Sequence, residues 1–410
     1  MHAEDVPLAA IAEAIGTPVF VYSTATIERH IRVFEDAIAG LGETLIAYAV
    51  KANPNGAVLA TLARLGVGAD VVSGGEIARA RHAGIAAEKI IFSGVGKTRD
   101  EMAMALAAGI GQFNLESEAE AQSLSEVAQA LGKTAPVAFR VNPDVDAETH
   151  AKISTGGAEN KFGIAYESAL DAYALADALP GLSVQGIAVH IGSQLTDLSP
   201  LRAAFARVGS LIEALRDRGQ SIALADLGGG LGVPYNPELR DPPSPADYGA
   251  MVAEATRGWD VKLVFEPGRV ITGNAGVLLT RVVRLKPGVS HPFVVVDAAM
   301  NDLLRPSLYD AWHDIRAVAP GAETMTATVV GPVCETGDTF ATGRTIDGVV
   351  EGDLLVFATA GAYAAAMASS YNSRPLTPEV IVSGDRWHLV RERPPVEALI
   401  AAESLPPWLQ

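Results

Sequence analysis

The sequence predicts an α/β fold: a (β/α)8 barrel of the TIM type joined to a second, mostly antiparallel β domain. Eight short apolar runs between about residues 44 and 268 are each followed by a helix-like stretch rich in Ala, Leu and charge. Beyond residue 268 this alternation gives way to β-rich runs separated by Gly, Pro, Asn and Asp. A chain of 410 residues has room for a barrel of about 250 residues and one smaller domain. We therefore assign 26–270 to the barrel, and 1–25 with 271–410 to the β domain.

The eight predicted barrel strands are near-continuous apolar runs. In chain order they are TLIAYAV (44–50), VGADVVS (67–73), IIFSG (90–94), QFNLE (112–116), PVAFRVN (136–142), VQGIAVHI (184–191), IALADLG (222–228) and KLVFEPG (262–268). Such strands, alternating with helices, are typical of a parallel sheet that is buried on both faces. Eight repeats favour a closed barrel over the alternative, an open doubly wound sheet.

The β domain is predicted from runs that have no long helical pattern between most of them. They include GVLLTRVVRL (276–285), PFVVVDAA (292–299), ATVVGPV (327–333) and GDLLVFATA (352–360). The strand-like segment TPVFVYS (17–23) precedes the first barrel unit, and we expect it to join this domain. The Pro-rich stretch NPELRDPPSPADY (236–248) predicts an irregular loop after the seventh barrel strand.

Charge and composition exclude several classes of function. Lys and Arg number 31 against 48 Asp and Glu, and the net charge of −17 disfavours nucleic acid and anionic membranes as partners. No apolar run reaches the roughly 18 residues that span a bilayer, and the N-terminal segment lacks the basic start of a signal peptide. The single cysteine, Cys334, excludes an intrachain disulfide and a multi-cysteine metal site. We expect a cytoplasmic protein that acts on a small molecule without a metal.

Polar residues at the carboxyl ends of the barrel strands are the candidate site, because barrel enzymes build their active sites there. These residues are Lys51, Asp70, Arg140, His190, the glycines Gly228, Gly229 and Gly230, and Glu266. If the strand assignments hold, the six positions converge on one mouth of the barrel.

Each candidate also has a simpler interpretation. Lys51 could form a Schiff base with a carbonyl, or extend its amine into solvent. The run LGGGLG (227–232) could bring backbone N–H groups to a phosphate, or only make a tight turn. His190 could stack on a flat ring or shuttle protons, with Ser193 adding a hydroxyl, or be a core histidine. Glu266 needs a cationic partner, which a structural pair with Arg269 would provide.

Taken together, these groups are what pyridoxal phosphate requires. A lysine holds the aldehyde as an imine, glycine amides hold the phosphate, and a carboxylate keeps the pyridine nitrogen protonated so that the ring accepts electrons. The combination is much more specific than any one of its members.

The sequence resembles the barrel-type (fold type III) pyridoxal-phosphate decarboxylases and, within them, the diaminopimelate decarboxylases, over nearly its whole length. The resemblance runs through AYAVKANPN, GADVVSGGEI, FSGVGKT, ISTGGAENKFGI, HIGSQ, GGGLGVPY, EPGR, MNDLLRPSLYDAWHDI, GPVCETGD and TAGAYAAAMASSYNSRP. The last three are the most particular to the diaminopimelate enzymes. The resemblance implies an alanine-racemase-like architecture. It also implies decarboxylation of meso-2,6-diaminopimelate to L-lysine and CO2, the last step of lysine biosynthesis.

The resemblance also implies roles for individual residues. Lys51 would carry pyridoxal 5'-phosphate, His190 would stack on its ring, and Glu266 would pair with its pyridine nitrogen. The remaining cofactor contacts would come from Asp70, Arg140, Ser193, Gly228, Gly229, Gly230, Pro267, Gly268, Arg269 and Tyr363. Arg269, Arg305 and Tyr309 would bind the carboxylate at the non-reacting end of the substrate, Glu335 the amine there, and Tyr363 both substrate and cofactor.

In this family the active site lies at a homodimer interface, so the resemblance implies that Cys334 and Glu335 come from the partner chain. Cys334 would be the proton donor and would act with Lys51 and His190 in catalysis. A substrate that ends in an amino-acid zwitterion needs a cation and an anion at a fixed separation, which Arg305 and Glu335 supply. Without its neighbours, Cys334 would be interpreted as a small buried apolar residue.

Three other functions remain to be compared. A decarboxylase of ornithine, arginine or carboxynorspermidine would act on an amine without the far carboxylate and leave a buried Arg305 or Arg269 unpaired. An amino-acid racemase on a similar architecture would place an arginine at the pyridine nitrogen, whereas this sequence has Glu266. A non-enzymatic pyridoxal-phosphate carrier would resemble the barrel alone, without the β domain that contains Arg305, Cys334 and Tyr363.

Overall fold

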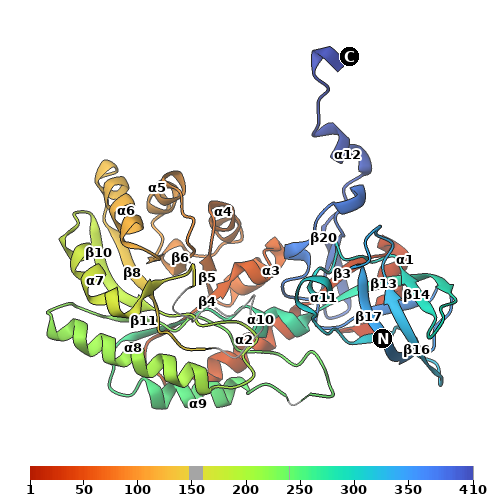
Figure 1. Cartoon of the computed structure of the whole chain (residues 1–410), viewed down its shortest axis with the longest axis horizontal. Coiled ribbons are helices and arrows are strands. Elements are labelled where there is room, and N and C mark those ends of the chain that lie inside the picture. Colours follow the sequence, from red (N-terminus) through yellow and green to blue (C-terminus); the bar gives the residue numbers. More distant parts are fainter. Residues whose placement is uncertain (147–159, 240, 410) are drawn as a thin grey trace. The chain divides into compact units, whose positions relative to one another are not determined.

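The computed structural model describes residues 1–146, 160–239 and 241–409, and Figure 1 shows the whole chain. The chain forms two compact units. The first comprises Ile27–Pro234 and Arg240–Ile271, and the second comprises Met1–Thr26, Tyr235–Leu239 and Thr272–Gln410. Residues 153–159 of the ISTGGAENKFGI motif lie outside the described residues.

Eight parallel strands close into the barrel of the first unit, as predicted. They are β4 (Thr44–Ala49), β5 (Gly68–Val71), β6 (Ile90–Phe92), β7 (Gln112–Leu115), β8 (Ala135–Asn142), β10 (Leu182–Ala188), β11 (Leu224–Asp226) and β12 (Lys262–Phe265). Their order is β10-β11-β12-β4-β5-β6-β7-β8, and the pairing of β8 with β10 completes the ring. This closure rules out the open sheet. A two-residue strand, β9 (Ile164–Ala165), pairs in parallel with the end of β8.

Helices follow the strands in alternation and surround them (Figure 1). They are α2 (Thr24–Ile38), α3 (Gly56–Arg64), α4 (Gly74–His82), α5 (Arg99–Ala108), α6 (Glu118–Ala130), α7 (Ala169–Ala178), α8 (Ser199–Asp217), α9 (Pro245–Ala255) and α10 (Arg269–Thr272). Side-chain caps fix several of their starts, for example Ser73 on α4 and Thr98 with Glu101 on α5. The turns between strand and helix at the barrel mouth therefore have defined ends.

The Pro-rich stretch 236–248 is only partly the loop that the sequence predicted. Helix α9 already begins at Pro245, because Ser244 and Asp247 form a capping box and proline suits the first helical position. The loop prediction is wrong for the last four residues.

The second unit is built on a mostly antiparallel sheet, as predicted. Its strands are β3 (Val19–Ser23), β13 (Gly276–Lys286), β14 (Phe293–Val296), β15 (Ile315–Ala317), β16 (Thr324–Val330), β17 (Thr339–Asp347), β18 (Leu354–Phe357), β19 (Glu379–Ser383) and β20 (Arg386–Arg391). The main order is β17-β16-β14-β13-β3-β19-β20, and β18 pairs with β13 and β15. The N-terminal strand β3 joins this sheet as expected. Two pairings, β14 with β16 and β3 with β19, are parallel.

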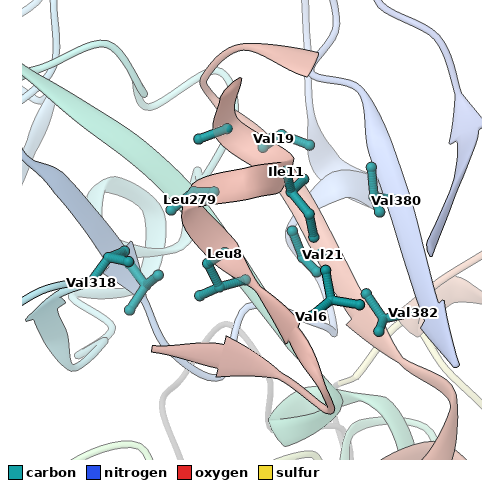
Figure 2. Packing of buried hydrophobic residues seen from close by; sticks show 11 residues of the cluster. Val6, Leu8, Ile11, Val19, Val21, Leu279, Val318, Val380 and Val382 are labelled. Carbon is teal, nitrogen blue, oxygen red and sulfur yellow. The ribbon is translucent and has the colours of Figure 1, made fainter. Parts of the chain in front are cut away.

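The N-terminal segment packs on the core of this domain (Figure 2). Leu8 and Ile11 of α1 (Leu8–Ile15) lie against alternate residues Val19 and Val21 of β3, together with Leu279 of β13. The other members of the cluster are Val6, Ala12, Val318, Val356, Val380 and Val382. Because residues from both ends of the chain share this core, the domain needs both ends to fold.

The remaining short elements are β1 (His2–Ala3), β2 (Val6–Pro7), α11 (Arg305–Tyr309) and α12 (Val396–Ala401). Among the residues that the structure describes, no helix is long and apolar enough to cross a membrane.

Candidate active site

Lys51 lies just beyond β4, in a 3₁₀ turn over Val50–Ala52. The following Asn55 caps helix α3 by accepting a hydrogen bond from the Ala57 N–H at 2.9 Å, so the turn is held between a strand and a capped helix. The Lys51 ammonium forms an ion pair with the carboxylate of Asp70, which lies in strand β5 one residue before its end and is fully buried. The Lys51 side chain is 36% exposed, so it lies at an accessible edge of the barrel rather than extending freely into solvent.

Three buried carboxyl groups lie together at this end of the barrel: Asp70, Asp226 at the end of β11, and Glu266 directly after β12. Burial, followed by the negative charges of Asp226 and Asp70, raises the pKa of Glu266 well above its usual value, while Lys51 opposes the shift. Burial also raises the pKa of Asp226 to about 6. Asp226 and Glu266 share a hydrogen bond, so one of the two carries a proton near neutral pH.

Asp226 is a site residue that the sequence analysis missed, together with the amides that hold it. Asn114 of β7 donates from Nδ2 to Asp226 Oδ2 at 2.9 Å, and the Gly228 N–H donates to Asp226 Oδ1 at 3.0 Å. Gln112 in turn donates to Asn114 Oδ1 at 2.6 Å. The signal was present, because Asn114 and Asp226 are polar residues within the barrel strands β7 and β11, just as Glu266 is a charged residue directly after β12.

His190 lies after β10 as a neutral imidazole. Its Nδ1 accepts a hydrogen bond from the Gly229 N–H at 3.2 Å. Burial, with the positive charges of Arg140 and Lys51, lowers the pKa of His190 well below its usual value. Arg140 of β8 donates to the His190 carbonyl at 3.2 Å and pairs with Glu116 at 3.5 Å. A neutral ring in a fixed orientation suits stacking on a flat molecule better than acid catalysis.

The triple glycine approaches its neighbours more closely than any side chain would allow. A Cβ on Gly229 would lie 2.2 Å from the Glu266 carbonyl oxygen, and one on Gly230 would lie 2.6 Å from that of Gly192. Gly228 and Gly230 also have φ values of +65° and +118°. Only glycine fits at these positions. The run is therefore more than a tight turn, because its backbone packs directly against the loops after β10 and β12.

The loop after β12 places a buried arginine, Arg269, at the same end of the barrel. Arg269 follows Pro267 and Gly268, opens α10, and is 6% exposed. Its Nη2 donates to the Ser193 hydroxyl at 3.0 Å. The glycine loop, Ser193 and Arg269 are thus linked through the loops after β10, β11 and β12.

The polar groups of the barrel fit pyridoxal phosphate. Glu266 Oε1 and Asp70 Oδ1 are buried and have no hydrogen-bond partner among the residues that the structure describes. An unsatisfied carboxylate oxygen is the acceptor that a protonated pyridine nitrogen needs, and Lys51 supplies the amine for the aldehyde. The glycine loop supplies backbone that can approach a phosphate closely.

The remaining predicted site residues belong to the second unit. Arg305 opens α11 and is 6% exposed, and Tyr309 ends this helix half-buried. Tyr363 is half-buried and has a φ of +55°, which is uncommon outside glycine and holds it in a defined turn. The structure therefore divides the predicted residues between two units, with the cofactor set on the barrel and the substrate set largely on the β domain.

Cys334 and Glu335 lie in the loop between β16 and β17, and both are exposed. The interpretation of Cys334 as a buried apolar residue is therefore wrong. Buried Asp338 holds the loop by accepting hydrogen bonds from the N–H groups of Met300 at 2.6 Å and Val333 at 2.7 Å. The Cys334 N–H donates to Asn372 Oδ1 at 2.9 Å. The side chains of Cys334 and Glu335 are thus exposed on a loop whose backbone is held by hydrogen bonds.

Comparison with known proteins identifies the family. Residues 24–273 match the family "Pyridoxal-dependent decarboxylase, pyridoxal binding domain". The chain is 55% identical to a diaminopimelate decarboxylase of Zymomonas mobilis over 99% of this chain and 97% of the relative, and 52% identical to one of Pseudomonas aeruginosa over the same shares.

A solved structure gives the same result. The crystal structure of Helicobacter pylori diaminopimelate decarboxylase complexed with L-lysine superposes with a TM-score of 0.93 at 39% identity, covering 96% of this chain and 98% of that one. The match extends over both units, which excludes a barrel-only carrier. The chain belongs to the pyridoxal-dependent decarboxylases and, within them, to the diaminopimelate decarboxylases.

Proposed function

We propose that the residues described above carry out the reaction of this family, the pyridoxal-phosphate-dependent decarboxylation of meso-2,6-diaminopimelate to L-lysine and CO2. The observation that carries the proposal is the cluster at the barrel mouth, where Lys51 lies beside buried carboxylates and one oxygen of Glu266 has no hydrogen-bond partner within the described parts of the chain. Relatives that match over nearly the full length of the chain support the same reaction.

The barrel residues would bind and tune the cofactor. Bound pyridoxal phosphate supplies an electron sink for the bond that breaks when CO2 leaves. Lys51 would hold the cofactor through Nζ, with Asp70 beside it, and Glu266 would keep a proton on the pyridine nitrogen. Asp226 would hold the Glu266 carboxyl group in place through their shared hydrogen bond. Neutral His190 would lie against the ring, braced by Arg140.

The phosphate would be held by the linked loops at the ends of β10, β11 and β12. Gly228, Gly229 and Gly230 would offer their backbone, Ser193 its hydroxyl, and the Pro267-Gly268-Arg269 turn both backbone and charge. The hydrogen bond from Arg269 to Ser193 supports this grouping.

The β domain would select the substrate and return a proton. Arg305 and Tyr309, with Arg269, would bind the carboxylate at the non-reacting end, and Glu335 would bind the amine there. Tyr363 would contact both substrate and cofactor. After CO2 leaves, the Cys334 thiol would donate its proton to the same carbon.

We further propose that the protein is a cytoplasmic homodimer with shared active sites that acts in lysine biosynthesis. The pyridoxal-phosphate-binding barrel would be 26–270, and the domain of 1–25 and 271–410 would contribute substrate and interface residues. The exposure of Cys334 and Glu335 on their own chain supports this arrangement, because groups in that position are available to a neighbouring subunit.

Purified protein with added pyridoxal phosphate tests the proposed reaction. With meso-diaminopimelate we expect equal amounts of L-lysine and CO2. Ornithine, arginine and carboxynorspermidine, which lack the far carboxylate, should be decarboxylated at least about a hundredfold more slowly, because buried Arg305 would be left without that carboxylate. Release of CO2 from one of these at a comparable rate would favour the alternative substrates, and inversion of an amino acid without CO2 release would favour a racemase.

A further inference from the structure

Two uncharged groups of its own unit, His313 and Tyr235, contact the guanidinium of Arg305. Arg305 Nη1 lies 2.8 Å from Nε2 of His313. Because a guanidinium only donates hydrogen bonds, His313 Nε2 must be the acceptor and carries no proton. Arg305 and His313 are both buried, at 6% and 2% exposed.

The other nitrogen of His313 fixes this tautomer. Its Nδ1 lies 2.9 Å from the carbonyl oxygen of Ala358, directly after β18, and must carry the proton in order to donate to it. The His313 carbonyl in turn accepts a hydrogen bond from Arg344 at 2.6 Å, and the Arg344 guanidinium lies 3.3 Å from the centre of the Trp312 ring. The imidazole is thus tied to the sheet through its ring and its backbone.

Tyr235 is the third residue of the group formed with Arg305 and His313. It follows the glycine loop in sequence but belongs to the same unit as Arg305. The Arg305 guanidinium carbon lies 4.4 Å from the centre of the Tyr235 ring. The Tyr235 and His313 rings meet edge to face, with centres 5.3 Å apart and planes at 77°. The Tyr235 ring therefore lies within cation–π distance of the guanidinium, while the His313 imidazole accepts a hydrogen bond from one of the guanidinium N–H groups.

We propose that His313 and Tyr235 are the positioning residues of Arg305, and that together they make the site selective for ligands with a carboxylate at the far end. This inference rests on the proposed role of Arg305 in binding that carboxylate. His313 and Tyr235 are both neutral, so neither of them cancels the charge of the guanidinium that it orients. A bidentate pair with a carboxylate needs a fixed guanidinium plane, and loss of either partner would release that plane.

The test compares two ligands of the holoenzyme that differ only in the far carboxylate: L-lysine, which has it, and cadaverine, which lacks it. His313→Leu removes the acceptor, whereas His313→Gln keeps an oxygen that can accept from Arg305. We expect His313→Leu to raise KM for meso-diaminopimelate and the dissociation constant of L-lysine by about tenfold, with kcat and cadaverine binding within about twofold. His313→Gln should restore most of the L-lysine affinity.

Tyr235 gives an independent test should His313→Leu fold poorly. Tyr235→Leu should weaken L-lysine but not cadaverine, while Tyr235→Phe, which keeps the ring, should bind both normally. His388→Leu, at an exposed position on β20, is the matched control and should change neither ligand.

Equal losses of L-lysine and cadaverine affinity in both leucine variants, or no loss of either, would overturn the inference. Arg305→Met separates this failure from failure of the proposed function. If Arg305→Met weakens L-lysine selectively while the leucine variants do not, only the positioning role is wrong. If Arg305→Met weakens L-lysine and cadaverine equally or neither of them, Arg305 does not bind the far carboxylate, and the positioning role of His313 and Tyr235 is wrong as well.

Discussion

The barrel and the β domain present their functional groups in opposite ways. On the barrel, Asp70, Asp226 and Glu266 are buried and interact with one another and with Lys51. On the β domain, Cys334 and Glu335 are exposed at the tip of a braced loop. Under the proposed roles, the cofactor-binding groups depend on burial within the barrel, whereas Cys334 and Glu335 are exposed and available to groups outside their own loop.

Burial shifts the pKa values of the carboxyl groups in the barrel, and it also costs free energy because charged groups are removed from water. Carboxyl groups removed from water and placed beside each other hold protons more tightly, which is why the pKa of Glu266 is raised well above its usual value. A cationic ring nitrogen against the unsatisfied Glu266 oxygen would remove that cost. The barrel half should therefore respond strongly to charge changes, and the β-domain loop to contact with a partner.

Removing the amine should have the largest effect. Lys51→Ala should abolish the visible imine absorption band of the isolated protein and lower decarboxylation by roughly 10⁴-fold or more, because no other group can hold the cofactor covalently there. Absorption and steady-state rates check this. Lys262→Ala, which removes a lysine at the start of β12 paired with Glu43, should keep the band. If the band is unchanged in Lys51→Ala, Lys51 is not the residue that forms the imine with the cofactor.

Neutralising the carboxylate should have the next largest effect. Glu266→Gln should keep the cofactor bound but slow decarboxylation by roughly 10²–10³-fold, because an amide cannot hold the pyridinium proton. The rate and the cofactor content of the purified variant are the measurements, and exposed Glu126→Gln is the control. Near-normal turnover would mean that the Glu266 carboxylate is structural.

The smallest expected effect concerns the pH dependence of stability in the cofactor-free protein. The pKa of Asp226 is raised to about 6 from an ordinary 3.8, so the folded state binds this proton more tightly than the unfolded state. Its stabilising contribution is present below the ordinary pKa and is lost as pH rises through about 6. A shift of this size corresponds to roughly 3 kcal/mol.

Urea unfolding of the cofactor-free protein between pH 4 and pH 7 measures this contribution. Asp226→Asn cannot titrate, so its free energy of unfolding should fall less over this range than that of the unaltered protein. Exposed Asp36→Asn should leave the profile unchanged. If Asp226→Asn shows the same fall, the buried pair is not its origin.

The fold could be predicted where a strand is buried on both faces and its sequence is therefore a nearly continuous apolar run. All eight barrel strands meet this condition, since both faces of a parallel sheet in a barrel are covered. Strands β15, β17, β19 and β20 were not identified. In β17 and β20, TFATGRTID and RWHLVR alternate apolar residues with exposed polar and charged ones at the sheet edges. Strand β15 has only three residues, and β19 (EVIVS) is an internal apolar strand that the sequence analysis did not select. Edge strands carry a weaker apolar signal.

The site could be predicted where one residue contrasts with its own strand. Lys51 and Glu266 are charged residues that follow the apolar strands β4 and β12, and Asp226 gives the same kind of signal at the end of β11. The sequence analysis selected the neighbouring glycines as a phosphate site and did not select Asp226. The group around Arg305 could not be found, because Tyr235 lies 70 residues before it and Ala358, the partner of His313, lies 45 residues after that histidine. Only the fold brings such residues together.

The most direct test of the central claim, that two copies of the chain share each active site, mixes two inactive variants. Lys51→Ala and Glu335→Ala have their defects on different units. If the site combines a barrel with the partner's loop, a mixed dimer has one site with both defects and one with none. Random exchange at equal amounts makes about half of the dimers mixed, so roughly a quarter of the sites should work.

A second mixture is the control. Lys51→Ala with Glu266→Gln places both defects on the barrel, so every site keeps one defect and no fully intact site can form. We predict recovery towards a quarter of the unaltered activity in the first mixture and none in the second. If subunit exchange is demonstrated and the first mixture stays as inactive as its parents, each chain builds its site alone and the shared-site account is contradicted.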